Sequence, residues 1–400
     1  MTAAIAETTA AAPRIRLQNP VLLVLVIAGA AAVAGTGFVA IAPNRLVSGR
    51  PVMLWTAGDG ATTAAIAVLG ALILVAAFIP ARRAWHWGTA LLSAALVLLT
   101  LVAAGHAAAA LAAGAPALAR VSLGAAFWVL FAASSLALVD AMQRAGTGAL
   151  AGLAIAASLI AAILLTASAG VFDALSLAQE YRNRRAEFSA ALSRHALIVV
   201  AAIGPAILIG FPLGVAALRR PQIQNPVFAT LNLLQTIPSI ALFGLLIGPL
   251  AALATAIPLL GQIGIGGIGP APAIIALITY ALLPVVRSTV AAFGGVDPAI
   301  VDAGRGMGMT ERQLFWHVEL PLAAPVLLAG LRIVTVQAIG LAVVAALIGA
   351  GGLGSFVFQG LGQYAGDLIL LGALPTIGLA LAADVLLQMA AGAARRRARP

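Results

Sequence analysis

Long uncharged stretches alternate with short polar segments along the whole chain. An apolar stretch of about 20 residues can cross a bilayer as a helix, so the pattern predicts about ten spans, five in each half. In chain order they are 21–41, 61–79, 88–111, 121–139, 148–170, 196–218, 225–250, 272–293, 322–347 and 368–391. Because a helix satisfies its own backbone hydrogen bonds in lipid, we expect an all-α polytopic membrane protein.

The first span follows a basic start, an arrangement that secretory signal peptides share. Its apolar core is too long for a signal peptide and no good small-residue cleavage site follows, so we favour a retained helix. The arginines between the next spans then fall mainly on one side, as the positive-inside rule requires. Those assigned to the cytosol are Arg14, Arg16, Arg82, Arg83 and Arg144. We therefore expect both termini in the cytosol, and this topology assigns every arginine to one membrane face or the other.

Residues 171–194 interrupt the hydrophobic pattern and divide the chain. Leu177, Tyr181, Phe188 and Leu192 share one side of a helix, which predicts an amphipathic helix on the outer membrane face. Such a helix can help to dock a binding protein or lie passively at the interface. The chain is predicted to have four parts. Residues 1–170 are expected to form an N-terminal accessory membrane region, followed by the external linker over 171–194. Residues 195–391 are expected to form a transport core, and residues 392–400 a basic cytosolic tail.

Within the transport core, residues 221–286 carry no charge and are too many for one crossing. Pro258 and the glycines of 261–269 are expected to divide them into an outward and an inward helix. Residues 351–366 are predicted to form an external loop before the last span.

Composition narrows the class of protein. The chain of 400 residues is 62% hydrophobic and 8% charged, as in polytopic membrane proteins. It has no cysteine, which excludes thiolate metal sites, and no lysine, which excludes a Walker A lysine. Any ATP hydrolysis must come from another chain, and we expect no cofactor here. The net charge of +10 is explained by arginines that flank spans rather than by nucleic-acid binding.

The segment 302–321 carries several charges between two apolar spans, so it must form a loop outside the lipid. Gly306 and Gly308 predict a turn after a short helix. Thr310 is placed to cap a second helix together with Gln313, and Pro321 is expected to end it before the next span.

This loop resembles the coupling loop of ABC-type import permeases, with every spacing of that pattern kept. The matching residues are Asp302, Ala303, Gly304, Gly308, Val318, Leu320 and Pro321. Asp302 replaces the usual Glu, and Gly304 replaces an Ala at a cost of about 1 kcal/mol of helix stability. The resemblance implies a type I importer transmembrane domain whose loop sits in a groove of a separate ATPase subunit. A capped cytosolic hairpin without a partner is the alternative.

Other stretches resemble the permeases that import glycine betaine, choline and carnitine as osmoprotectants. They are 232–239 (NLLQTIPS), 272–277 (PAIIAL), 280–284 (YALLP), 306–310 (GMGMT) and 348–354 (IGAGGLG). The extra N-terminal spans resemble a longer branch of that family, and Arg287-Ser288 departs from its usual Arg-Asn. The resemblance implies a bacterial inner-membrane location, a separate extracytoplasmic binding protein, an ATPase that holds ATP and Mg²⁺, and a second permease, identical or different.

Two further groups of residues are candidates for function, one for the transport path and one for an outer gate. Gln235, Thr236, Pro238 and Ser239 place polar groups and a free carbonyl within a span, where they either line the path or join helices. Tyr280 can offer its ring to a quaternary ammonium or simply pack in the core. Gly351, Gly352 and Gly354 are candidates for an outer gate, close helix packing being the alternative.

Other functions stay open. His106 lies within a span, where an ionisable group is a candidate site or a hydrogen-bonded neutral side chain near the helix end. An ion-coupled secondary transporter would need embedded acidic residues, and only Asp384 lies deep in a predicted span. An intramembrane enzyme is disfavoured because no HExxH or nucleophile-elbow motif occurs. An ABC permease for another small solute is the remaining alternative.

Overall fold

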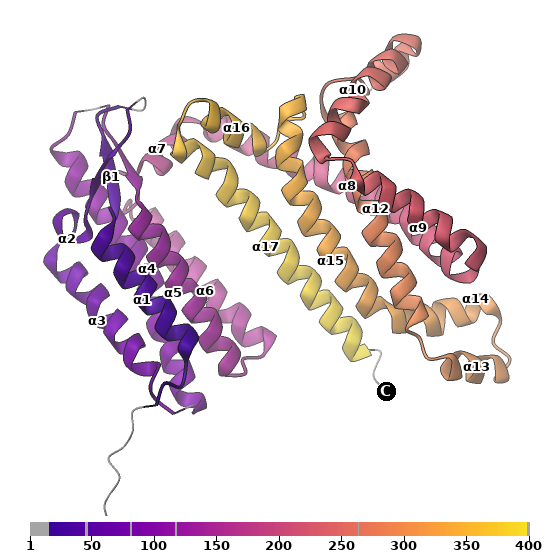
Figure 1. Ribbon diagram of the computed structural model, residues 1–400, viewed down its shortest axis with the longest axis horizontal. Helices are drawn as coiled ribbons and strands as arrows, with labels where there is room; N and C mark the ends of the chain where they lie inside the picture. Colours follow the sequence, from indigo (N-terminus) through magenta and orange to yellow (C-terminus); the bar gives the residue numbers. More distant parts are fainter. Residues whose placement is uncertain (1–15, 45–46, 81, 117, 263, 398–400) are drawn as a thin grey trace, which may run out of the picture. The chain divides into compact units, whose positions relative to one another are not determined.

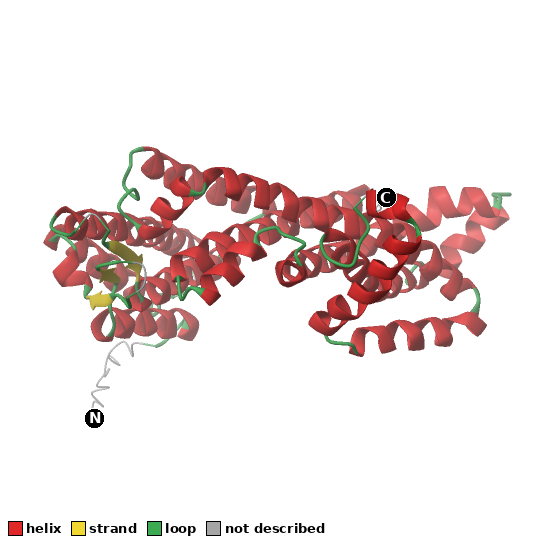
Figure 2. Cartoon of the chain, turned by 90° about the horizontal axis from the view of Figure 1, so that it is seen from above, coloured by secondary structure: helices red, strands yellow, loops and turns green. Residues whose placement is uncertain are grey.

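The computed structural model describes residues 16–44, 47–80, 82–116, 118–262 and 264–397. Its contacts divide the chain into two compact units, Met1–Gln179 and Glu180–Pro400. Helices make up most of both units, and within the described residues strands occur only in the N-terminal unit (Figure 2). Arg14 and Arg399, predicted in cytosolic tails, lie outside the described residues.

The N-terminal unit is a helical bundle with a small sheet at one end (Figure 1). Its elements are α1 (Pro20–Gly35), β1 (Val39–Ala42), β2 (Arg50–Val52), α2 (Leu54–Ala57), α3 (Gly60–Ala76), α4 (Arg83–Ala113), β3 (Arg120–Leu123), α5 (Ala125–Arg144) and α6 (Ala149–Ser168). The unit ends within α7 (Ser176–Asn183).

The three-stranded sheet was not predicted. It has the antiparallel order β2-β1-β3, with Val39 opposite Val52 on one side and Leu123 on the other. The predicted spans 21–41 and 121–139 were therefore wrong at one end, because Val39–Ala42 and Val121 belong to strands. The short β-branched segments pair with one another, which satisfies backbone groups beyond the helix ends.

Side chains of three elements hold the bundle together. Phe38 and Phe127 are fully buried with their rings edge to face, centroids 5.9 Å apart, and so join the sheet to α5. At the other end of α1, Asn19 accepts the Leu22 amide through Oδ1 (3.1 Å) and donates through Nδ2 to Asp140 (2.6 Å). Asp140 therefore ties the start of α1 to the end of α5.

His106 is an exposed residue of α4. Hydrogen bonds from Thr62 lower the pKa of Asp59, the residue that caps α3, and the charge of His106 contributes to the same shift. The role of His106 stays a prediction.

The C-terminal unit consists of helices. They are α8 (Arg185–Arg219), α9 (Pro221–Thr236), α10 (Ser239–Ala256), α11 (Pro258–Gln262), α12 (Pro270–Gly294), α13 (Pro298–Gly306), α14 (Glu311–Leu314), the π-helical turn η1 (Phe315–Glu319), α15 (Leu320–Val344), the 3₁₀ turn η2 (Ala345–Ile348), α16 (Gly354–Gly362) and α17 (Gly366–Arg397). Figure 1 shows α15 and α17 side by side, with α13 and α14 at one end of α15.

Within the described residues, eight helical stretches of the chain are long and apolar enough to cross a membrane. Two predicted spans of the N-terminal unit correspond to the shorter apolar helices Pro20–Gly35 and Gly60–Ala76. The protein is thus a multi-pass membrane protein, as the sequence pattern predicts.

Glycines bring the long helices of the C-terminal unit close together. A Cβ on Gly214 of α8 would lie 2.6 Å from Thr289 of α12. A Cβ on Gly330 of α15 would lie 2.2 Å from Ser288 of α12. Membrane helices associate through such small-residue contacts because lipid supplies no hydrophobic drive between them. Ser288, which departs from the family pattern, therefore packs against α15.

Two predicted boundaries near prolines were wrong. The span 225–250 is divided between α9 and α10 at Ile237-Pro238, because proline has no N–H and forces the residue before it out of the helical region. Pro321 does not end the second loop helix, since η1 continues into α15. The wider turn of η1 accommodates the missing N–H of Pro321 within one continuous helical stretch.

Two predicted connections contain helices. The linker 171–194 forms α7 and then the first turns of α8, so Phe188 and Leu192 belong to the long helix rather than to a separate interfacial one. The predicted outer loop 351–366 contains α16, which packs against α17.

Candidate functional site

The loop between α12 and α15 begins with a helix that is capped at both ends. Asp297 accepts the amide of Ala299 (2.9 Å) at the start of α13. At the far end, Gly308 has φ +82°, its amide donates to the carbonyl of Arg305 (2.9 Å), and the Met309 amide donates to that of Gly304 (3.1 Å). This pair of bonds is a Schellman motif, which accounts for the glycine at position 308.

The predicted capping box forms at the start of α14. The Gln313 amide donates to the hydroxyl of Thr310 (3.3 Å), and the Thr310 amide donates to Oε1 of Gln313 (2.8 Å). Two backbone donors at the helix start are thereby satisfied. The turn between α13 and α14 is fixed from both sides.

The glycine at position 304 is explained by the side chain of Leu314, which packs against it. Leu314 is 1% exposed, and a Cβ on Gly304 would lie 2.6 Å from its side chain. A methyl group at position 304 would displace Leu314. The glycine weakens α13 locally but allows the two short helices to share a small core.

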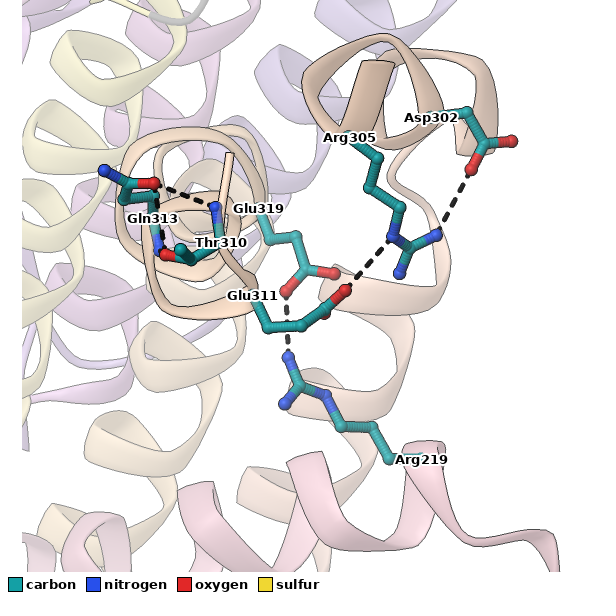
Figure 3. A network of polar contacts seen from close by, with 7 residues as sticks. All are labelled: Arg219, Asp302, Arg305, Thr310, Glu311, Gln313 and Glu319. Atoms are coloured by element: carbon teal, nitrogen blue, oxygen red, sulfur yellow. Dashed lines mark hydrogen bonds and ion pairs between the residues drawn. The ribbon is translucent and has the colours of Figure 1, made fainter. Parts of the chain in front are cut away.

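Ion pairs join the two short helices to each other and join η1 to α8 (Figure 3). Arg305 donates to Asp302 within α13 (3.2 Å) and to Glu311 at the start of α14 (3.1 Å). Glu311 raises the pKa of Arg305 further above its ordinary value, with Asp302 adding to the shift. Arg219, the last residue of α8, donates to Glu319 of η1 (3.0 Å).

Aromatic rings continue this connection into the membrane helices. Phe315 of η1 stacks on Phe293 near the end of α12, with centroids 5.5 Å apart and planes at 4°. Phe211 of α8 meets Phe293 edge to face at 5.8 Å. The guanidinium of Arg219 lies over the Phe315 ring, 5.5 Å from its centroid. The loop is thus attached to α8 and α12 as well as to α15.

The coupling-loop residues lie together in this segment. Their positions are as follows: Asp302, Ala303 and Gly304 in α13, Gly308 in the turn, Val318 in η1, and Leu320 and Pro321 at the start of α15. Two large apolar side chains of the same segment are exposed, Met307 by 78% and Trp316 by 55%.

The candidate path residues gather at the break between α9 and α10. Gln235 donates to the carbonyl of Tyr280 (2.8 Å), and the hydroxyl of Tyr280 donates to the carbonyl of Ile237. The hydroxyl of Thr236 donates to the carbonyl of Leu233 (2.7 Å). Pro238 is the residue that caps α10, and Ser239 is its first residue. The bonds between Gln235, Ile237 and Tyr280 join the break to α12, and Tyr280 is 8% exposed.

The candidate gate glycines form the turn between η2 and α16. Gly351 and Gly352 have φ of +78° and +82°, and a Cβ on Gly354 would lie 2.0 Å from the Val343 carbonyl oxygen. Gly352 packs against His195, a fully buried residue of α8 whose Nε2 lies 3.1 Å from the Ile339 carbonyl. His195 was not predicted, although it directly precedes the predicted span at 196.

Two arginines within spans were also missed, because the topology assigned every arginine to a membrane face. Arg332, in the middle of α15, forms a two-pronged pair with Asp384 of α17, with Nη2 donating to Oδ2 at 2.9 Å. Arg287 of α12 donates through Nη2 to Oδ1 of Asn232 on α9 (2.7 Å). Since Asp384 is paired with Arg332, it does not supply the free carboxyl that ion coupling needs.

Comparison with known proteins identifies the C-terminal unit. Residues 206–399 match the family described as "Binding-protein-dependent transport system inner membrane component". The carnitine transport permease protein OpuCB of Listeria monocytogenes is 42% identical over 191 residues, which cover 48% of this chain and 80% of that protein. The chain belongs to the permeases of binding-protein-dependent transport systems. This permease is also 43% identical over 194 residues to the osmoprotectant import permease protein OsmW of Salmonella typhimurium, covering 48% of this chain and 85% of that protein.

The N-terminal unit has a separate match. Residues 16–178 match the family described as "ABC transporter permease YehY, N-terminal domain". The choline transport system permease protein OpuBB of Bacillus subtilis is 39% identical over 196 residues, 49% of this permease and 83% of that protein. Among solved structures, an inward-facing MetNI methionine ABC transporter is similar to 55% of this chain and 99% of that chain, with 24% identity and a TM-score of 0.43.

Proposed function

We propose that this permease is the membrane subunit of an ATP-driven importer for a quaternary-amine osmoprotectant such as glycine betaine, carnitine or choline. Its relatives carry the names of carnitine, osmoprotectant and choline permeases, which supports this class of cargo. The importer would lie in the bacterial inner membrane with both termini of the permease in the cytosol. A separate ATPase would hold ATP and Mg²⁺, a separate extracytoplasmic protein would deliver the cargo, and a second permease would complete the path.

The exposed apolar tip of the loop supports docking of the ATPase. Met307, next to the end of α13, and Trp316, in η1, are both largely exposed, and the turn between α13 and α14 is fixed at both helix ends. Large apolar side chains that are exposed in a polar loop mark an interaction surface, since contact with water is unfavourable for them. We infer that the segment Asp302–Pro321 inserts this tip into a groove of the ATPase.

The contacts between the loop and the membrane helices indicate how a movement of the loop would be transmitted. Arg305 joins α13 to α14, so the two short helices would move as one body. The Arg219–Glu319 pair and the stacked rings of Phe293 and Phe315 would pass that movement to α8 and α12, while η1 leads directly into α15. ATP-driven motion of the partner would thereby tilt three membrane helices together.

The test is the double variant Met307→Glu, Trp316→Glu in the full permease, reconstituted with its ATPase and binding protein. Both changes are at exposed positions, so we expect normal insertion and an unchanged thermal midpoint. ATP-dependent uptake should fall by about 10-fold or more and the ATPase should no longer co-purify, because two charges would enter an apolar interface. Tyr364→Ser, at a position 96% exposed in the turn before α17, is the matched control.

Normal co-purification and uptake in the double variant would contradict the proposed docking surface. The cargo is tested separately, with radiolabelled glycine betaine, carnitine and choline supplied to the wild-type complex. Uptake of at least one, abolished by omission of ATP, is expected. Uptake by the permease without any ATPase would instead support an ion-coupled transporter.

A further inference from the structure

Arg287 and Arg332 lie within the membrane-spanning helices α12 and α15, and of these two only Arg332 has a counter-charge. Arg332 is neutralised by Asp384. Arg287 is bound through Nη2 to the neutral Asn232, and within the described residues no carboxylate lies within ion-pair distance of it. An arginine in a span is costly unless it faces protein or water, so an uncompensated one indicates a functional position.

Arg287 lies within the candidate span α12 rather than at its end. It stands seven residues before Gly294, where α12 meets the loop, or about 10 Å along the helix at 1.5 Å per residue. This distance is about a third of a hydrocarbon core of about 30 Å.

The direction of the side chain agrees with this depth. Helix side chains lean toward the N-terminus of their own helix. α12 ends at Gly294, beside the loop, so the side chain of Arg287 leans away from the loop and toward the middle of the bilayer.

The surrounding side chains form a polar, exposed strip between α9 and α12. Arg287 and Asn232 are both exposed, and Thr236, one turn beyond Asn232 on α9, is exposed as well. One N–H of the guanidinium is used by Asn232, and the others have no acceptor among the described residues. A planar guanidinium with free N–H groups is suited to a two-pronged bond with a carboxylate.

A second copy of this chain would not supply that carboxylate. The acidic residues described in the C-terminal unit lie in loops or near helix ends, except for Asp384 in the middle of α17. Asp384 already binds Arg332. A carboxylate that pairs with Arg287 would therefore come from outside the chain.

We propose that Arg287, oriented by Asn232, binds the carboxylate of a zwitterionic permeant as it crosses the membrane. This inference rests on the proposed function. It adds that cargos with a carboxylate depend on Arg287 and cargos without one do not. Glycine betaine and carnitine carry both a quaternary ammonium and a carboxylate, whereas choline carries the ammonium with a hydroxyl. Arg287 would act on the first two cargos and not on choline.

The test compares uptake of glycine betaine and choline by the reconstituted wild-type complex and by Arg287→Gln, with the same ATPase and binding protein. We expect Arg287→Gln to lower glycine betaine uptake by about 10- to 100-fold, the range for loss of a charge-assisted hydrogen bond. Choline uptake should stay within about 2-fold, since the ammonium does not contact the guanidinium. Arg287→Lys keeps the charge but not the two-pronged hydrogen bond, so its glycine betaine uptake should lie between that of the wild type and that of Arg287→Gln.

Arg332→Gln is the matched control, because it removes an arginine from a span without touching the strip. It should lower uptake of both cargos in parallel with the amount of folded protein, since Asp384 is left unpaired. A parallel loss of both cargos in Arg287→Gln, or no loss of either, would overturn the inference while leaving the proposed function intact.

The wild-type complex itself separates the two proposals. If it carries neither cargo, the proposed function fails and this inference fails with it. If it carries choline alone, the inference is overturned and an importer of quaternary amines still stands. If it carries glycine betaine alone, Arg287→Lys decides: uptake about 3-fold or more above that of Arg287→Gln supports the carboxylate contact, and equal uptake refutes it.

Discussion

At the loop end of the C-terminal unit, helices are joined mainly by polar and aromatic side chains, whereas at the other end of α15 they are joined by glycines. Arg305, Arg219 and Phe315 make the contacts at the loop end, partly in solvent. Where η2 leads into α16, Gly354 brings one backbone against the next. The loop end can therefore lose contacts one at a time, while Gly354 leaves no room for an added methyl group.

The largest expected effect is at the glycine end. A methyl group on Gly354 would lie 2.0 Å from the Val343 carbonyl oxygen, so α16 must move away from α15 in Gly354→Ala. We expect a loss of about 3 kcal/mol, at the upper end for overpacking, and a clearly lower thermal midpoint in detergent. Gly362→Ala is the control, since nothing lies within 4 Å of its added Cβ. Equal midpoints for the two variants would show that the glycine contact is not tight.

A cavity at the loop end should have a smaller effect that can be partly reversed. Leu314→Ala removes the buried side chain between α13 and α14 and should cost about 2 to 3 kcal/mol. Gly304→Ala alone should also destabilise the loop, because its methyl group meets Leu314. Together the two changes should cost less than their sum, since the new methyl group enters the vacated space. A double-mutant cycle measured by hydrogen exchange of the loop amides checks this, and additive costs would contradict the packing described.

Arg219→Ala separates stability from coupling. The Arg219–Glu319 pair is half-exposed, so its loss should cost only about 0.5 to 1 kcal/mol. Under the proposed function, uptake per ATP hydrolysed should nevertheless fall severalfold, because α8 would no longer follow η1. Arg220→Ala, at the adjacent exposed residue, should leave that ratio unchanged. The ratio of cargo flux to phosphate release in proteoliposomes is the measurement, and equal ratios for the two variants would exclude Arg219 as a link.

The smallest effect is expected for Arg305→Gln. Both of its partners, Asp302 and Glu311, are largely exposed, and exposed pairs contribute little to folding. The thermal midpoint of the variant should hardly differ from that of the wild type. Raising the salt concentration from about 0.1 M to about 1 M should likewise change the midpoint of the wild type very little. Met307→Ser is a control at an exposed position without a charge. A marked drop in the midpoint for Arg305→Gln alone would mean that the loop end depends on this pair.

Sequence patterns were most informative where local chemistry decides the structure. Thr310 and Gln313 form their capping box and Gly308 takes a positive φ, because both depend on residues a few positions away. The apolar stretches likewise predict the long helices, since lipid leaves a helix few alternatives. The family resemblance of the transport core is confirmed by the comparisons.

Contacts between distant segments could not be predicted in this way. Val39–Ala42 forms a strand only because Arg50–Val52 and Arg120–Leu123 pair with it. The partners of Arg332 and Arg287 lie on other helices. No pattern in the residues around either arginine identifies Asp384 or Asn232 as its partner. The roles of the coupling-loop, path and gate residues stay predictions, because they concern partners and cargo.

The two capped ends around Met307 have a consequence for kinetics. A loop whose turn is already set by the Schellman motif and the capping box has little chain entropy left to lose when another protein receives it. Such a preformed tip would engage without a slow folding step, so the rate of association would be set by encounter and orientation rather than by rearrangement of the loop.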